Sequence, residues 1–157
     1  MQKLVTFLWF DGNAEAAATF YVSLIPNSQL GEIQRYGAAG PGEAGSVMTV
    51  AFELNGAPFV ALNGGPSFKF TEAVSLQVPC DSQAEVDRLW DAFIAGGGEE
   101  SQCGWLKDKW GLSWQITPTR MPELIGGPDP VKAQRAMQAM FGMKKLDIAA
   151  LERAREG

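Results

Sequence analysis

Hydrophobic and polar positions change their period several times in the first half of the chain, and each change marks a structural element. An apolar, β-rich segment at residues 3–10 predicts a strand, and Asn13 is a reasonable N-cap for a helix that ends near residue 24. Asn55-Gly56 is a strong two-residue turn signal and predicts a hairpin. Three further strands are expected, over residues 29–36, 47–54 and 58–63.

The second half repeats this order. A strand is expected over residues 73–79, and a helix capped by Asp81 or Ser82 runs to about residue 95. Three short strands follow, over residues 99–103, 104–107 and 112–118. A repeated unit that cannot close its own core is expected to pack against its copy. We therefore expect one domain at residues 1–128, built from two modules of about 1–68 and 69–128.

The tail differs from both halves. Asp129 is expected to cap a helix through about Met143, and Asp147 to cap a shorter helix. From residue 129 onward there are six basic and four acidic residues, whereas the whole chain has a net charge of −5. This weakly basic, amphipathic tail predicts a C-terminal helical extension at residues 129–157 that packs on the body or on a partner subunit.

Composition narrows the possible functions. The chain has 13 Lys and Arg against 18 Asp and Glu, which argues against a nucleic-acid or anionic membrane surface. It contains no histidine, the usual general base near neutral pH and the commonest metal ligand. Any chemistry must therefore use carboxylates, amides, hydroxyls, thiols or lysines.

The cysteines and the apolar runs bear on localisation. Cys80 and Cys103 are too few for a disulfide framework. The apolar run at the N-terminus is too short for a signal peptide, and no other run approaches the roughly 18 residues of a membrane span. We therefore expect a soluble cytoplasmic protein that has neither nucleic acid nor membrane as a partner.

Three motifs resemble a known family. They are residues 10–17 (FDGNAEAA) with Phe20-Tyr21, residues 103–108 (CGWLKD) with 110–116 (WGLSWQI), and residues 132–148 (KAQRAMQAMFGMKKLDI). They look like the PhnB-like, 3-demethylubiquinone-9 3-methyltransferase-like family of the glyoxalase/bleomycin-resistance (vicinal oxygen chelate) superfamily. The resemblance implies an α+β fold in which two βαβββ modules form a curled mixed sheet around a small-molecule cavity, usually in a homodimer.

The resemblance also implies where a metal would be held. Metal-dependent members of the superfamily use four His or Glu ligands, and the matching positions here are Thr6, about Ala61, Ser75 and Gln115. None of these is a histidine, a cysteine or a carboxylate, and neutral oxygens bind divalent transition metals poorly. We therefore expect no metal and no cofactor; Glu53 would alter this only if the strand register were shifted.

Methyl transfer, which the family name suggests, is not expected. A typical methyl-donor site uses a glycine-rich turn between a parallel strand and a helix. The glycines of this chain cluster at residues 37–45, 64–65, 96–98 and 126–127. None of these clusters joins an apolar strand to a helix with the required spacing, so we interpret them as hinges, helix ends and loops.

Side-chain alternation, counted from Thr6, Ser75 and Gln115, predicts which residues line the cavity. The expected wall is apolar and amide-bearing, which suits a neutral or weakly polar, partly flat ligand. The candidate ligand-binding residues are Thr6, Phe10, Asn63, Ser75, Gln77, Trp105, Lys107, Trp114 and Gln115. A plainer interpretation assigns these residues no ligand. In that case the polar groups form hydrogen bonds with one another, the tryptophans pack in a core or an interface, and Lys107 belongs to a solvated turn.

Two functions remain open at this point. One is non-catalytic binding of a small molecule in a metal-free cavity. The other is a metal-independent enzyme, of lyase, isomerase or transferase type, acting on a small aromatic or dicarbonyl compound. In that case Lys107 or a glutamate would be the acid or base, and Cys103 is interpreted as an inert thiol because no histidine can deprotonate it. No catalytic residue is assigned.

Overall fold

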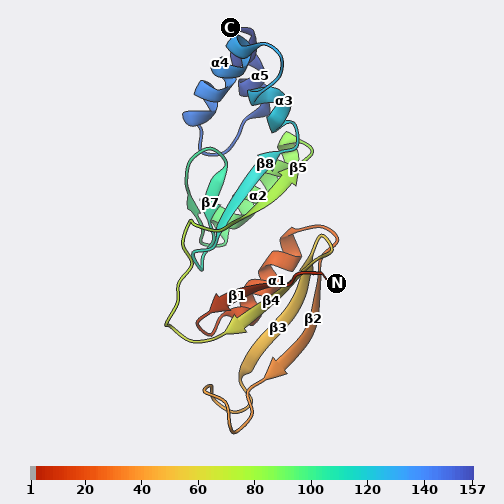
Figure 1. Cartoon of the computed structure of the whole chain (residues 1–157), viewed down its shortest axis with the longest axis vertical. Coiled ribbons are helices and arrows are strands. Elements are labelled where there is room, and N and C mark those ends of the chain that lie inside the picture. The colour runs from red at the N-terminus through yellow and green to blue at the C-terminus, as the bar shows by residue number, and fades with distance from the viewer. Residues whose placement is uncertain (1–2) are drawn as a thin grey trace. The chain divides into compact units, whose positions relative to one another are not determined.

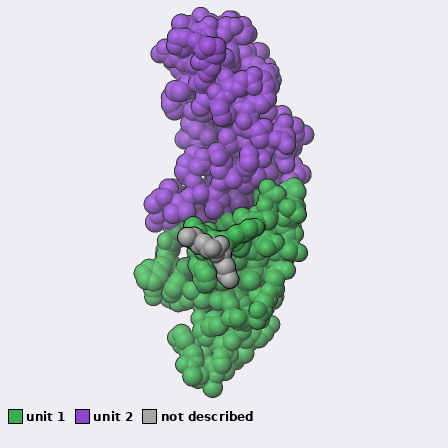
Figure 2. All heavy atoms as spheres, turned by 45° about the vertical axis from the view of Figure 1, so that its right-hand side comes forward, with its two compact units in different colours: residues 1–70 green, residues 71–157 purple. Residues whose placement is uncertain are grey.

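The computed structural model describes residues 3–157 and divides the chain into two compact units, residues 1–70 and 71–157 (Figure 2). Each unit contains a strand, a helix and three more strands in chain order, as the sequence predicts (Figure 1). The α+β class is confirmed. Strand pairing stays within each unit, so the structure has two four-stranded mixed sheets rather than one continuous curled sheet.

The first unit is built on a sheet with the strand order β1-β4-β3-β2. Strand β1 pairs with β4 in parallel, and the other pairs are antiparallel. The elements are β1 (Thr6–Phe10), α1 (Ala14–Leu24), β2 (Gln29–Arg35), β3 (Val47–Leu54) and β4 (Ala57–Asn63).

Helix α1 covers one face of this sheet. Its buried side consists of small residues and Tyr21, so the helix lies close to the strands. The strand residues buried with it are Leu8, Phe10, Val50, Phe52, Phe59 and Ala61. These residues alternate with exposed or half-buried ones along each strand, so the exposed and half-buried side chains lie on the face opposite α1.

The second unit repeats this arrangement with the strand order β5-β8-β7-β6, in which β5 and β8 are parallel. Helix α2 begins after Ser82, whose side chain accepts a hydrogen bond from the backbone N–H of Glu85. The apolar side of α2 is Val86, Leu89, Trp90 and Phe93, as predicted from its spacing. The elements are β5 (Ser75–Cys80), α2 (Gln83–Ala95), β6 (Glu99–Glu100), β7 (Trp105–Lys107) and β8 (Ser113–Pro118).

The tail forms three helices: α3 (Met121–Ile125), α4 (Pro130–Phe141) and α5 (Ile148–Glu156). Asp129 and Asp147 cap α4 and α5 with their side chains, as expected, whereas α3 was not predicted. The helices share a small core of Met121, Leu124, Leu146 and Leu151. Within residues 3–157, no helix is long and apolar enough to cross a membrane.

Candidate functional site

The face of the second sheet that lies opposite α2 carries most of the predicted polar residues. Trp114 is buried towards α2, with its ring centroid 4.9 Å from that of Phe93. Because side chains alternate along a strand, Ser113, Gln115 and Thr117 lie on the other face. We call this face, the side of β5, β8 and β7 opposite α2, the open face of the second sheet.

Strand register orders this face into rows. Lys107, Ser113 and Ser75 occupy facing positions on β7, β8 and β5. Trp105, Gln115 and Gln77 form the next row. Side chains at facing positions of an antiparallel pair have Cβ atoms about 5 Å apart, so they are in reach of one another. The structure therefore brings together the predicted residues Ser75, Gln77, Trp105, Lys107 and Gln115.

One pair on this face is already hydrogen-bonded. The Gln115 side-chain Nε2 donates to Ser75 Oγ at 2.8 Å. The amide and the hydroxyl thus satisfy each other across the parallel β5–β8 pair, as the plainer interpretation of the polar groups has it. The bond also fixes the orientation of the Gln115 amide on a half-buried surface.

Ser113 differs from its neighbours. Only 1% of the residue is exposed, and its hydroxyl has no hydrogen-bond partner anywhere in residues 3–157. Buried hydroxyls are nearly always hydrogen-bonded, to protein groups, to water or to a ligand. Ser113 is therefore a polar group on the open face whose partner does not come from the described chain.

Lys107 forms an ion pair with Glu72, which lies in the turn before β5. The pair links β7 to the turn that precedes β5. Each partner favours the charged form of the other: the Lys107 ammonium lowers the pKa of Glu72, and the hydrogen bond to Glu72 raises the pKa of Lys107.

Trp114 does not line this face, contrary to the prediction. Its Nε1 donates to Oδ2 of Asp108 at 2.9 Å, and both residues are buried. Oδ1 of Asp108 accepts hydrogen bonds from the backbone N–H groups of Trp110 and Leu112. Sequence reasoning treated residues 107–109 as a solvated turn and missed Asp108. The sequence does contain a pattern that could have identified Asp108: an aspartate at the start of a turn that ends at Gly111. An aspartate in this position typically accepts hydrogen bonds from the backbone of the turn.

The candidates in the first unit lie on the α1 side of their sheet, and alternation counted from Thr6 was wrong there. Phe10 is 3% exposed and packs edge-on against Phe70. Thr6 shares its strand parity and is exposed at the start of β1. Oδ1 of Asn63 accepts from the backbone N–H of Ala14 at 2.9 Å, and its Nδ2 donates to the Val47 carbonyl. Asn63 therefore anchors the start of α1.

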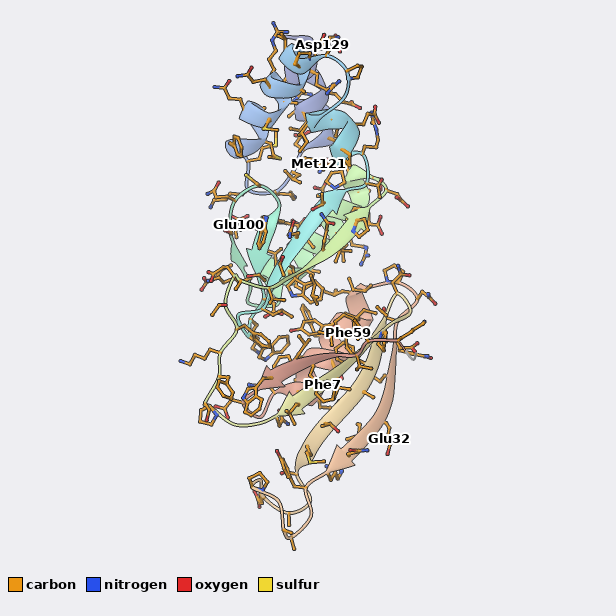
Figure 3. All side chains as sticks on the ribbon, in the orientation of Figure 1. Phe7, Glu32, Phe59, Glu100, Met121 and Asp129 are labelled. Carbon is orange, nitrogen blue, oxygen red and sulfur yellow. The ribbon has the colours of Figure 1, made fainter. Side chains whose placement is uncertain are left out.

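The opposite face of the first sheet is hollowed instead. A cavity of about 300 Å³ is lined there by apolar and polar side chains, among them Glu32. Phe7 on β1 is 62% exposed and forms part of its wall (Figure 3). The full lining is Phe7, Glu32, Gln34, Thr49, Ala51 and Val60. Sequence reasoning named none of these residues, although alternation counted from Phe7 rather than Thr6 would have found that wall.

The metal site that the sequence resemblance implies does not fit the residues at the four matching positions. Ala61 has no donor atom and is fully buried, and Thr6 lies on the α1 side of its sheet. Ser75 and Gln115 offer neutral oxygens and are bonded to each other. Across residues 3–157, no group of three or more His, Cys, Asp or Glu side chains is placed to hold a metal ion.

Comparison with known proteins agrees with this fold. The profile of the 3-demethylubiquinone-9 3-methyltransferase family matches residues 2–117. A solved structure described as a putative 3-demethylubiquinone-9 3-methyltransferase, PhnB protein, from Bacillus cereus is 38% identical, with a TM-score of 0.68 over 75% of this chain and 100% of that chain.

More distant structures share the fold alone. Protein PA1353 from Pseudomonas aeruginosa is 22% identical, with a TM-score of 0.61 over 75% of this chain and 98% of that one. The fosfomycin resistance protein FosX from Listeria monocytogenes is 14% identical, with a TM-score of 0.50 over 78% of this chain and 93% of that one. Comparison with curated proteins gives no match. The chain belongs to the 3-demethylubiquinone-9 3-methyltransferase (PhnB-like) family.

Proposed function

We propose that this protein binds a small, partly flat organic molecule on the open face of its second sheet, without a transition metal. One observation carries the proposal: Ser75, Ser113 and Gln115 place hydroxyl and amide groups side by side on β5 and β8. Two of them, Ser75 and Gln115, stand at positions where metal-dependent relatives would need imidazole or carboxylate ligands. Trp105, in register with Gln115, offers a half-buried aromatic surface beside these groups.

The same face favours binding over catalysis. A general acid or base works best when its pKa is near the operating pH. The ion pair moves the two ionisable groups of this face away from neutrality, because the pKa of Lys107 is raised and that of Glu72 is lowered. Neither residue is therefore suited to proton transfer near pH 7, which counts against the metal-independent enzyme.

The family name does not make methyl transfer the better choice. The structure's strand-to-helix connections within residues 3–157 are residues 11–13, between β1 and α1, residues 81–82, between β5 and α2, and residues 119–120, between β8 and α3. Only the first contains a glycine, Gly12. A phosphate- or methyl-donor-binding turn needs several glycines so that the backbone can approach its ligand.

We further propose a cytoplasmic homodimer. Val5 and Phe7 are 47% and 62% exposed on the hollowed side of the first sheet, an apolar surface of the kind that a second copy of the chain covers. Cys80 and Cys103 are both unpaired, as is usual in a reducing compartment. Light scattering of the wild type and of Phe7→Glu tests the dimer, because a charge there is expected to shift the population to monomer.

A fragment screen by thermal shift, run with and without EDTA, tests the binding function. We expect flat fragments to raise the melting temperature equally in both conditions, since the site needs no metal. Gln115→Leu should abolish the shift, whereas Gln138→Leu on the exposed surface of α4 should keep it. Stabilisation that requires added metal, or a Gln115→Leu variant that binds like the wild type, would overturn the proposal.

A further inference from the structure

We infer that the ligand of this face carries a carboxylate, and that this group takes the place of the Glu72 carboxylate at Lys107. The inference rests on the proposed binding at the open face of the second sheet and specifies which chemical class binds there.

The Lys107–Glu72 ion pair is exchangeable. The two side chains are 37% and 62% exposed, and Glu72 lies in a turn rather than in a strand. Exposed ion pairs of this kind are weak, because water solvates both charges and the side chains lose freedom when they pair. A carboxylate that gains additional hydrogen bonds at the same place can therefore compete with Glu72.

Ser113 offers such an additional bond. It lies between Lys107 and Ser75 in register, and its buried hydroxyl lacks a partner among the described residues. A hydroxyl donates one hydrogen bond, and an ammonium group donates three and accepts none. The two groups thus form a donor pair for an acceptor with two oxygens, and charge-assisted bonds to a carboxylate are among the strongest available.

The surrounding charges favour a singly charged ligand. Glu99 faces Lys107 across the β6–β7 pair, and its negative charge contributes to the raised pKa of that lysine. Lys107 therefore stands between Glu72 and Glu99. A dianion such as a phosphate monoester would be repelled by both glutamates, whereas a carboxylate replaces one negative charge by another.

The row next to Lys107 indicates the rest of the ligand. Trp105 and Gln115 lie two residues along β7 and β8 from Lys107 and Ser113, on the same face. A flat body attached to the carboxylate would lie beside the indole and within reach of the Gln115 amide. Benzoate is a simple probe of this class, and benzamide is its neutral counterpart of the same shape.

Titrations with benzoate and benzamide at fixed ionic strength, followed by ¹H–¹⁵N NMR shifts, test the inference. We expect benzoate to bind more tightly than benzamide to the wild type. Glu72→Gln should raise the benzoate affinity by about two- to fivefold, the range in which exposed ion pairs contribute. Lys107→Gln should lower it to the level of benzamide, and Ser113→Ala should lower it severalfold.

The Lys132–Glu156 ion pair provides matched controls, since its side chains are 37% and 71% exposed. Lys132→Gln and Glu156→Gln should leave both affinities unchanged. If benzoate and benzamide bind equally in all variants and only Gln115→Leu weakens them, the carboxylate inference is wrong while the proposed function stands. If neither probe shifts residues of β5, β7 or β8, the inference fails; if the fragment screen is also negative, the proposed function fails with it.

Discussion

The indole N–H of Trp114 donates a hydrogen bond to the Asp108 carboxylate at 2.9 Å, within a pair of residues that are only 1% and 4% exposed. The bond joins the β7–β8 turn to the second residue of β8, on the α2 side of the sheet. Lys107 and Ser113, which are the chain neighbours of these two residues, point to the open face. The buried pair therefore sets the position of the polar groups that we propose bind the ligand.

Asp108→Asn should destabilise the protein. The amide retains one accepting oxygen, but its NH₂ group would meet either the Trp114 N–H or the backbone donors of the turn. A buried donor left without a partner costs about 1–3 kcal/mol, and we expect a loss of that size in the free energy of unfolding measured with urea. Asp91→Asn, at an exposed ion pair, should cost less than about 0.5 kcal/mol. Equal losses would show that Asp108 has no special structural role.

Asn63 and Asn13 should respond differently to alanine. The sequence predicts Asn13 as the cap of α1, yet its side chain makes no capping hydrogen bond, and Asn63 from β4 bonds the N–H of Ala14 instead. Asn63→Ala should therefore cost about 1–2 kcal/mol, the usual value of a helix cap. Asn13→Ala should cost clearly less. Denaturation of the two variants measures this difference, and the reverse order would refute the assigned anchor.

Cys80 should make the protein less stable in alkali. Burial, followed by the negative charge of Glu85, raises the pKa of its thiol to about 12. The unfolded thiol ionises near pH 9, so above that pH the unfolded state binds fewer protons and stability falls as the pH rises. Between pH 8 and 10 the wild type should lose about 1 kcal/mol more than Cys80→Ala. Parallel curves for the wild type and Cys80→Ala would contradict the raised pKa.

The order of elements could be predicted because both modules show clear changes of hydrophobic period. On the second sheet Ser75, Gln77 and Gln115 share one face, as alternation along the strands predicts. The prediction placed Trp114 on the same face as Gln115. The two residues are adjacent in β8, and neighbours in a strand point to opposite faces. The role of Trp114 depends on Asp108, a contact that a pattern of apolar positions does not encode.

On the first sheet the parity was wrong by one residue. Residues 11–13 join β1 to α1, and Gly12 in this turn has a φ of 81°. The length of such a turn sets which residues of β1 face the helix. Hydrophobicity alone cannot identify these residues, because Phe7 and Phe10 lie on opposite faces and are both aromatic. The hollow lined by Phe7 and Glu32 was missed for this reason.

The most direct test of the account is a ¹H–¹⁵N NMR titration of the wild-type protein with flat fragments in the presence of EDTA. We predict that the shifted amides cluster on β5, β7 and β8, with the largest changes at Ser75, Trp105 and Gln115. We also predict that replacing the EDTA with Zn²⁺ or Mn²⁺ leaves the affinities unchanged, since the donor set at the matching positions does not suit either ion. Shifts confined to the hollow around Phe7 and Glu32, or binding that appears only with added metal, would contradict the account.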